Sequence, residues 1–232
     1  MDNFSISMRR TLDETRALLL RTGLELLHDR GLFVAVTHIR LADVARAADL
    51  TTGAAYRIWE RQEDFHLDLA VAAIRHRNEH SLKATVVQIH DALDAGAPLA
   101  EVLRIGAIAH RYLVSPTDPF LIALSLRTLS TAVPELADAA QARHAESMEA
   151  FEGLYRVVLD RYRRRIRPPM GIEALSHALA ALSEGFAMQT MSGIEHPCYE
   201  LPDLPPGVGS DWSLLALAVE GVVERLTEPI PD

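Results

Sequence analysis

Apolar residues recur every three or four positions along almost the whole chain, and this spacing matches one face of an α-helix. The first such segment covers about residues 11–30 and stops at Gly31, a residue that often ends helices. Two short helices are predicted next, at about 41–48 and 52–59. No long segment alternates between apolar and polar residues, as a half-buried strand does. The pattern therefore predicts an all-α fold.

Longer helices fill the remainder of the sequence, separated by short loops. Residues 34–39 are rich in β-branched side chains and are predicted to form a connector in which Thr37 is a candidate N-cap. Pro168 and Pro169 end one long helix because proline cannot continue the hydrogen-bond ladder. The further helices are predicted at about 63–80, 82–93, 99–113, 119–131, 134–165, 172–191 and 212–226.

The last two predicted helices each carry two apolar stripes. The body of one chain can cover one side of each helix, so we expect the same pair from a second chain to cover the other side in a four-helix, homodimeric interface. The alternative is that both stripes belong to the internal core. The residues predicted at the dimer interface are Leu175, Leu179, Leu182, Phe186, Leu215, Val219 and Val222. The second stripe is mostly of smaller residues, namely Ala174, Ala178, Ala181, Gly185 and Met188 with Leu214, Leu217, Ala218 and Gly221.

Composition limits the class of protein without naming a function. Of the 232 residues, 49% are hydrophobic and 24% are charged, which is typical of a globular chain. No apolar run approaches the roughly 18 residues that cross a bilayer, and residues 1–10 lack the apolar core of a secretion signal. Cys198 is the single cysteine, so an internal disulfide is excluded. We therefore expect a cytoplasmic protein with no membrane contact.

Charge is distributed unevenly along the chain. The net charge is -9, but residues 1–61 contain nine arginines and eight acidic residues and are therefore close to neutral. The rest of the chain carries the acidic excess, which repels phosphate. Any contact with nucleic acid is therefore expected within the N-terminal segment.

The most informative segment is DVARAADLTTGAAYRIW, residues 43–59. It is predicted to form two short helices joined by a tight turn, with Ala55 and Trp59 facing inward and Thr51 capping the second helix. The residues near the exposed N-terminal half of that helix are Thr52, Gly53, Tyr56 and Arg57. This is the end that enters the major groove in helix-turn-helix proteins. Arginine can bond a guanine edge or a phosphate, hydroxyls can donate to phosphate, and glycine lets the backbone approach closely.

The same segment resembles the DNA-binding motif of TetR-family transcriptional regulators. The shared pattern begins with a hydrophobic residue and Ala, followed by three residues and the turn. After the turn come a hydrophobic residue, Ser or Thr, one further residue and Gly. Tyr follows after two more residues, and an aromatic residue stands three positions after Tyr. The resemblance covers about residues 11–65 and implies a DNA-binding domain at 1–62, followed by a helical effector-binding and dimerisation domain at 63–232. The DNA-contact residues that it implies are Arg40, Thr51, Thr52, Gly53, Tyr56, Arg57 and Arg61.

Several positions depart from the family pattern, among them Asp49, Gln62 and Ile58, and the connector from Gly31 to Val44 is longer than usual. Asp49 occupies a turn position that usually holds Gly, and Asp tolerates the left-handed conformation better than most residues. Gln62 stands where the family usually has a phosphate-binding Lys, which removes one charge-assisted contact. The neighbouring Arg61 is the candidate to replace it.

The body offers candidate ligand-binding residues. By the same resemblance it encloses a pocket for a small effector, and the aromatic stripe of one long helix is either a wall of that pocket or ordinary core packing. The candidate pocket residues are His110, Tyr112, Phe151 and Tyr155. Glu195, His196 and Cys198 have no second ligand pair at a regular spacing, so no metal site and no cofactor are predicted. The arginines between positions 161 and 167 are predicted to stabilise a helix C-terminus.

Three classes of function remain: a ligand-responsive DNA-binding regulator, a helical enzyme, and an adaptor that binds protein only. An enzyme needs a convergent set of catalytic groups, and the sequence contains no nucleophile elbow, phosphate loop or His-Glu metal motif. An adaptor would bind no DNA at any salt concentration. The sequence favours a dimeric repressor that binds a double-stranded operator and is released by a small apolar effector.

Overall fold

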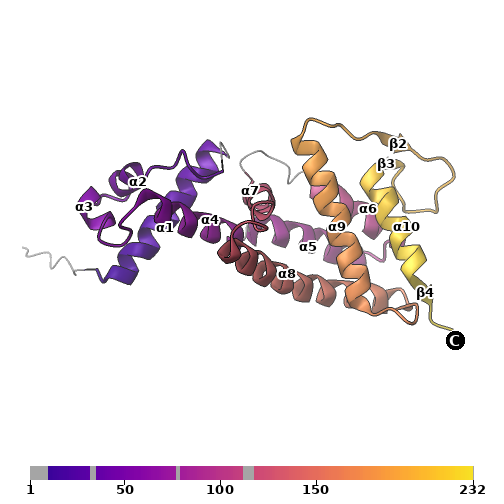
Figure 1. The fold of residues 1–232 in the computed structure, drawn as a ribbon. Coiled ribbons are helices and arrows are strands. Elements are labelled where there is room, and N and C mark those ends of the chain that lie inside the picture. The colour runs from indigo at the N-terminus through magenta and orange to yellow at the C-terminus, as the bar shows by residue number, and fades with distance from the viewer. Residues whose placement is uncertain (1–9, 32–34, 77–78, 112–117, 232) are drawn as a thin grey trace, which may run out of the picture.

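The computed structural model describes residues 10–31, 35–76, 79–111 and 118–231. Helices α1 to α3 lie at one end of an elongated molecule, α4 leads away from them, and α5 to α10 form the other end (Figure 1). We call α1–α4 the head and α5–α10 the body. The helices of the described part are α1 (Leu12–Arg30), α2 (Leu41–Ala47), α3 (Thr52–Ala55), α4 (Gln62–Arg75), α5 (Glu79–Asp94), α6 (Leu99–Arg111), α7 (Pro119–Arg127), α8 (Pro134–Arg161), α9 (Ile172–Met191) and α10 (Leu214–Leu226).

The predicted all-α architecture is confirmed, with two small strand pairs added to it. Each strand has three residues, and both pairs are antiparallel. The pairs are β1 (Arg164–Ile166) with β4 (Thr227–Pro229), and β2 (Cys198–Glu200) with β3 (Asp211–Ser213). No helix within the described ranges is both long and apolar enough to span a membrane.

The ends of α1 follow from local sequence signals. Thr11 and Glu14 form a capping box, in which each side chain accepts a hydrogen bond from the backbone N–H of the other residue. At the other end the N–H of Gly31 donates to the carbonyl of Leu27, and Gly31 has a positive φ of 71°. Thr37, by contrast, lies in a turn ahead of α2 and caps no helix there, because α2 begins after Arg40.

The head core is fastened by one carboxylate. Trp59 is buried beneath α3, and its indole Nε1 donates to Asp68 Oδ2 on α4 at 2.5 Å. The same oxygen accepts from Arg16 Nη2 of α1 at 2.5 Å, and the Arg16 guanidinium lies 5.9 Å from the centre of the Trp59 ring. Phe65 packs edge-on against that ring with 5.2 Å between the centroids. Three separate segments of the head are thus joined at Asp68.

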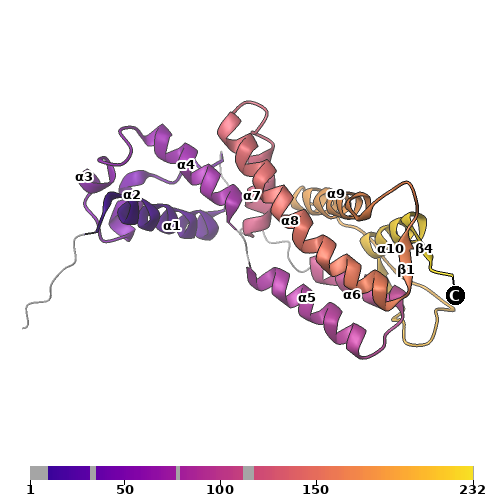
Figure 2. The ribbon, with the colours of Figure 1, turned by 90° about the horizontal axis from the view of Figure 1, so that it is seen from below.

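Helix α4 also packs into the body. The buried cluster that fills the head continues into α7 and α8 through Ile122, Leu126, Leu136 and Ala139. The predicted helix at 63–80 was too long, because α4 ends at Arg75 and His76 adopts an extended backbone with φ -64° and ψ 130°. Helix α8 begins beside α7 and runs to the far end of the body (Figure 2).

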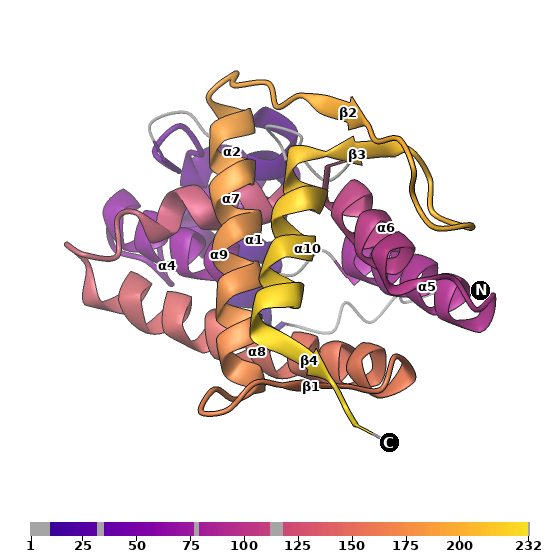
Figure 3. The ribbon, with the colours of Figure 1, turned by 90° about the vertical axis from the view of Figure 1, so that its right-hand side faces the viewer.

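The far end of the body is closed by α9, α10 and the strand pairs. Helices α9 and α10 lie side by side on one face of the molecule (Figure 3). The predicted helix at 134–165 stops at Arg161, and the arginines that follow bind carboxylates of the C-terminal segment instead of continuing the helix. Arg164 pairs with Glu224 at 2.9 Å, and Arg165 and Arg167 both pair with Glu228, at 2.8 and 3.1 Å.

Replacing Asp68 with Ala is expected to lower the free energy of unfolding by about 1–3 kcal/mol, because the buried indole N–H of Trp59 loses its acceptor. The measurement is urea unfolding followed by tryptophan fluorescence. Asp64→Ala is the matched control, because it removes an exposed carboxylate on the same helix whose solvent-screened ion pair with Arg61 contributes little to stability. Equal effects of the two substitutions would show that Asp68 does not fasten the head.

Candidate functional site

The helix-turn-helix is compact, and its second helix is shorter than predicted. α3 consists of Thr52–Ala55, and the chain then forms a turn through residues 56–58. Thr51 caps α3 as expected, since its Oγ1 accepts from the N–H of Ala54 at 3.2 Å. Asp49 has a φ of 53°, so the turn adopts the left-handed conformation that the sequence suggested.

One side of α3 is buried and the other is exposed. Ala55 and Trp59 face the core, with exposed fractions of 0% and 4%. The exposed residues of this segment are Thr51, Thr52, Gly53, Tyr56 and Arg57. A Cβ added at Gly53 would meet nothing within 4 Å, so its backbone is open to close approach from outside. The structure thus brings five of the predicted contact residues together on one surface, with Arg40 exposed at the start of α2.

Gln62 has a structural role that the sequence did not reveal. Its side-chain oxygen accepts from the N–H of Leu41 at 3.0 Å, which caps α2 where Arg40 supplies no side-chain cap. Its amide nitrogen donates to the carbonyl of Ile39 at 3.2 Å. Gln62 therefore fixes the start of α2 to the start of α4. Arg61 is exposed and forms an ion pair with Asp64 at 2.8 Å, so its charge is partly engaged within the head.

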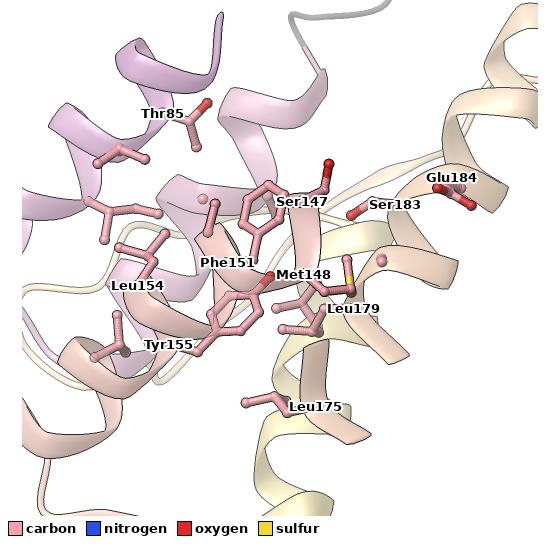
Figure 4. A pocket seen from close by; sticks show the side chains of 18 of the residues that line it. Thr85, Ser147, Met148, Phe151, Leu154, Tyr155, Leu175, Leu179, Ser183 and Glu184 are labelled. Atoms are coloured by element: carbon pink, nitrogen blue, oxygen red, sulfur yellow. The ribbon is translucent and has the colours of Figure 1, made fainter. Parts of the chain in front are cut away.

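The body contains a cavity of about 570 Å³. Most of its lining is apolar and includes residues of five helices, among them Ile89, Val102, Leu154, Leu179 and Val219. Figure 4 shows side chains of α8 and α9 gathered around this space, with the ring of Phe151 beside that of Tyr155. A concave, largely apolar space of this size is typical of small-molecule sites.

Tyr155 places a polar group in this apolar space. Burial raises the pKa of its hydroxyl to about 12, so the group is neutral at physiological pH and can donate one hydrogen bond. Ser147 and Ser183 provide further hydroxyls on the lining. A bound molecule would therefore meet a mainly apolar wall with a few polar groups that could orient it.

Charged residues line the cavity where it approaches α7. Arg127 of α7 and Glu184 of α9 form an ion pair at 2.5 Å. His144 and His177 stack with 5.2 Å between ring centroids, and their facing nitrogens are 3.2 Å apart. Arg143 of α8 also lines the cavity, and its Nη1 donates to the carbonyls of Ile74, at 2.6 Å, and His76. Arg143 thus connects the cavity to the C-terminal end of α4.

Next to this contact, two histidines meet between head and body. The rings of His28 on α1 and His76 after α4 have centroids 4.9 Å apart. Burial lowers the pKa of His28, and the charge of His76 lowers it further, whereas Asp29 raises it. Burial also lowers the pKa of His76, with an added effect of the Arg143 charge. His28 Nε2 is buried without a hydrogen-bond partner among the described residues.

Comparison with solved structures finds the same fold in proteins described as transcriptional regulators. The chain matches a candidate transcriptional regulator from Rhodococcus sp. RHA1 with a TM-score of 0.56 and 15% identity, over 91% of this chain and 94% of that one. It matches a TetR-family regulator from Cytophaga hutchinsonii with a TM-score of 0.54 and 13% identity, over 97% and 100%. The chain has the TetR fold. A third match, the multidrug binding protein EbrR complexed with imidazole, has a TM-score of 0.53 and 19% identity, over 100% and 99%. In sequence, neither a family model nor a curated protein matches it.

Within this TetR fold, the predicted pocket residues have different outcomes. Phe151 and Tyr155 both line the cavity. Tyr112 and the side chain of His110 lie outside the described residues. Sequence reasoning missed Arg127, Arg143 and Glu184, because single charged residues on long helices carry no local signal of a shared cavity.

The two stripes of α9 and α10 also have different environments in the TetR-fold body. Leu175, Leu179 and Leu215 are only 2–6% exposed within one chain, and the remaining members of that stripe pack in the same two internal clusters. The stripe predicted at the dimer interface is therefore covered by the chain itself. The stripe of smaller residues is more open: Ala181 and Gly221 are exposed, and Met188 is 46% exposed.

The histidine pair gives the TetR-fold chain a pH-dependent stability. A folded-state pKa below the ordinary value of about 6.5 means that the unfolded chain binds more protons near that pH. The contribution of the pair is therefore fully present above pH 7 and is lost as the pH falls through 6.5 toward the lowered values. We expect the midpoint of urea unfolding to fall between pH 7.5 and pH 5.5. The double substitution His28→Gln and His76→Gln should make this fall smaller; an unchanged pH dependence would assign it to other groups.

Proposed function

We propose that the chain is a cytoplasmic transcriptional regulator that binds operator DNA through α2 and α3 as a two-fold dimer and is released by a small effector in the body cavity. The observation that carries the proposal is the exposed surface of Thr52, Gly53, Tyr56 and Arg57 on α3 and the turn after it, a segment whose inner side is anchored through Trp59. A rigidly held, exposed helix end of this composition is what major-groove recognition needs.

The chemistry of this surface supports DNA as the partner. Arg57 can pair with a guanine edge or a phosphate, while Thr52 and Tyr56 can donate to phosphates. The acidic body would repel the duplex, which keeps the contact on the near-neutral head. Gln62 is committed to capping α2, so Arg40 and Arg61 remain as the cations that flank the recognition surface.

A dimer is proposed because one α3 offers few contacts. Two heads would engage half-sites separated by about one helical turn of DNA, roughly 34 Å, or a multiple of it. We assign the interface to the outer, small-residue face of α9 and α10, since small residues let helices of two chains approach closely.

The cavity is the proposed effector site. Its volume of about 570 Å³ and mainly apolar lining suit a small molecule, and EbrR, which shares the fold, is described as a multidrug binding protein. An effector acts only through different affinities for two conformations, so a ligand that favours the DNA-free arrangement would release the operator. Together these features favour a repressor.

The first test concerns the recognition surface. An operator is selected from random duplexes with the parent protein, and affinity is then measured by fluorescence anisotropy. Replacing Tyr56 and Arg57 with Ala should weaken binding at least about tenfold, because one base-edge contact is worth about 1–3 kcal/mol. Arg156→Ala, an exposed arginine on α8, is the control and should leave affinity unchanged. Parent-like affinity of the double variant would exclude α3 as the recognition helix.

The second test concerns the dimer and uses three glycines. A Cβ at Gly185 or Gly221 meets nothing within 4 Å in one chain, so glutamates there should fold normally yet clash across the proposed interface. Sedimentation of Gly185→Glu with Gly221→Glu should show monomers with strongly reduced operator affinity. Gly153→Glu is the matched control, because Gly153 is equally open but lies on α8 away from this face. A double variant that stays dimeric would contradict the assigned face.

A further inference from the structure

Arg143 occupies a position that no other described residue shares. It lines the cavity, and it also donates to the carbonyl of Ile74 in the last turn of α4 and to that of His76 just after the helix. We propose that Arg143 is the effector sensor, and that the effector is an apolar molecule with a carboxylate head that takes the guanidinium away from α4. This inference rests on the proposed function, because α4 joins the candidate DNA-binding helices α2 and α3 to the body.

The carbonyls that Arg143 holds need a partner. The last carbonyls of a helix have no acceptor role within the helix, and here the chain leaves the helical conformation at His76. The guanidinium therefore stabilises the C-terminal end of α4 both by hydrogen bonding and by its charge. Moving it away would leave this end less well held, next to the contact between His28 and His76.

The chemistry of the site favours a carboxylate as the competitor. A guanidinium binds a carboxylate through two parallel hydrogen bonds that are shorter and stronger than bonds to neutral carbonyls. The other arginine on the lining, Arg127, is engaged by Glu184 at 2.5 Å. The acid Asp118 accepts from the N–H of Phe120 at 2.7 Å and caps α7. Both acids on the lining, Glu184 and Asp118, therefore already have partners within the protein. This disfavours a ligand with a cationic head group.

The course of the cavity fits the remainder of such a molecule. Arg143, Ser147, Phe151 and Tyr155 lie on successive turns of one face of α8, and all four line the cavity. From Arg143 to Val158 this face extends about 22 Å at 1.5 Å per residue. Figure 4 shows the polar side chains of Ser147, Ser183 and Glu184 toward one end, and Leu154 and Leu175 farther along. If the carboxylate of the ligand binds Arg143, its apolar tail would lie between α6, α8 and α9.

The ligand half of the proposal is tested by calorimetry without DNA. Decanoate, decanol and decylamine share one tail and differ in the head, and 4-phenylbutyrate with 4-phenylbutanol forms a second pair. Each carboxylate should bind at least about tenfold more tightly than its alcohol, because a hydrogen bond to a charged group is worth more than a neutral one. Decylamine should bind weakest. Equal binding of acid and alcohol, a preference for the amine, or no carboxylate binding in either series overturns the proposal.

The Arg143→Gln variant tests the residue itself. Decanoate affinity should fall at least about tenfold in this variant, because the charged donor is lost, while decanol affinity should be unchanged. Arg156→Gln, an exposed arginine on the same helix, is the control. Retained preference for decanoate in the Arg143→Gln variant would overturn the role of Arg143.

The proposed coupling between ligand binding and DNA binding is tested by two measurements, hydrogen exchange at the end of α4 and operator affinity. Decanoate should speed hydrogen exchange of the amides at the end of α4 and lower operator affinity at least about tenfold in the parent protein, and do neither in Arg143→Gln. Decanoate that binds through Arg143 but leaves both unchanged overturns the coupling. Failure of the ligand-free parent to bind any DNA is a separate result that refutes the proposed function, and the calorimetric preference is measured independently of it.

Discussion

The packing of α4 into both halves of the molecule is the contact on which the remaining arrangement depends. Its N-terminal half holds the head through Phe65, Asp68 and Leu69, and its C-terminal half packs with α7 and α8. Gly23 of α1 permits the close approach, since a Cβ there would lie 3.1 Å from Leu69 Cδ1. One buried cluster thus runs from α3 to the body, so the head cannot tilt without a change along α4.

The cavity is significant because folded proteins fill their interiors closely. Empty apolar space costs stability, since the side chains around it lose dispersion contacts. A cavity of about 570 Å³ with a mainly apolar lining is therefore space that a ligand can fill with a gain in contacts. The buried hydroxyl of Tyr155, kept neutral by its raised pKa, adds direction to an otherwise apolar wall.

The parts of the fold that depend on local signals could be predicted, and those that depend on distant contacts could not. The capping box at Thr11, the cap at Thr51 and the bounds of α9 all follow from neighbouring residues. The end of α4 does not, because no Gly or Pro follows it closely and the partner of the Ile74 carbonyl is Arg143, 69 positions away.

The two stripes of α9 and α10 show the same limit. Both are apolar, so periodicity could not decide which one faces inward. The neighbours α6 and α8 decide it, by covering the larger residues. At the candidate DNA surface, sequence spacing correctly placed Ala55 and Trp59 inward and Thr52 and Tyr56 outward, whereas the role of Gln62 depends on contacts with Ile39 and Leu41 more than 20 positions away.

The relation between cavity, dimer face and head follows from which helices they share. α9 and α10 line the cavity with their inner sides, and their outer sides form the proposed interface. In the proposed dimer these two helices are the fixed part, and the elements between them and α4 are α7 and α8. Both α7 and α8 line the cavity, through residues that include Arg127 and Arg143. A molecule in the cavity therefore contacts the elements that join the fixed interface to the helix carrying each head. In the proposed dimer the two heads would have to match a half-site spacing set by the DNA, so a displacement at the end of α4 would change the spacing of both.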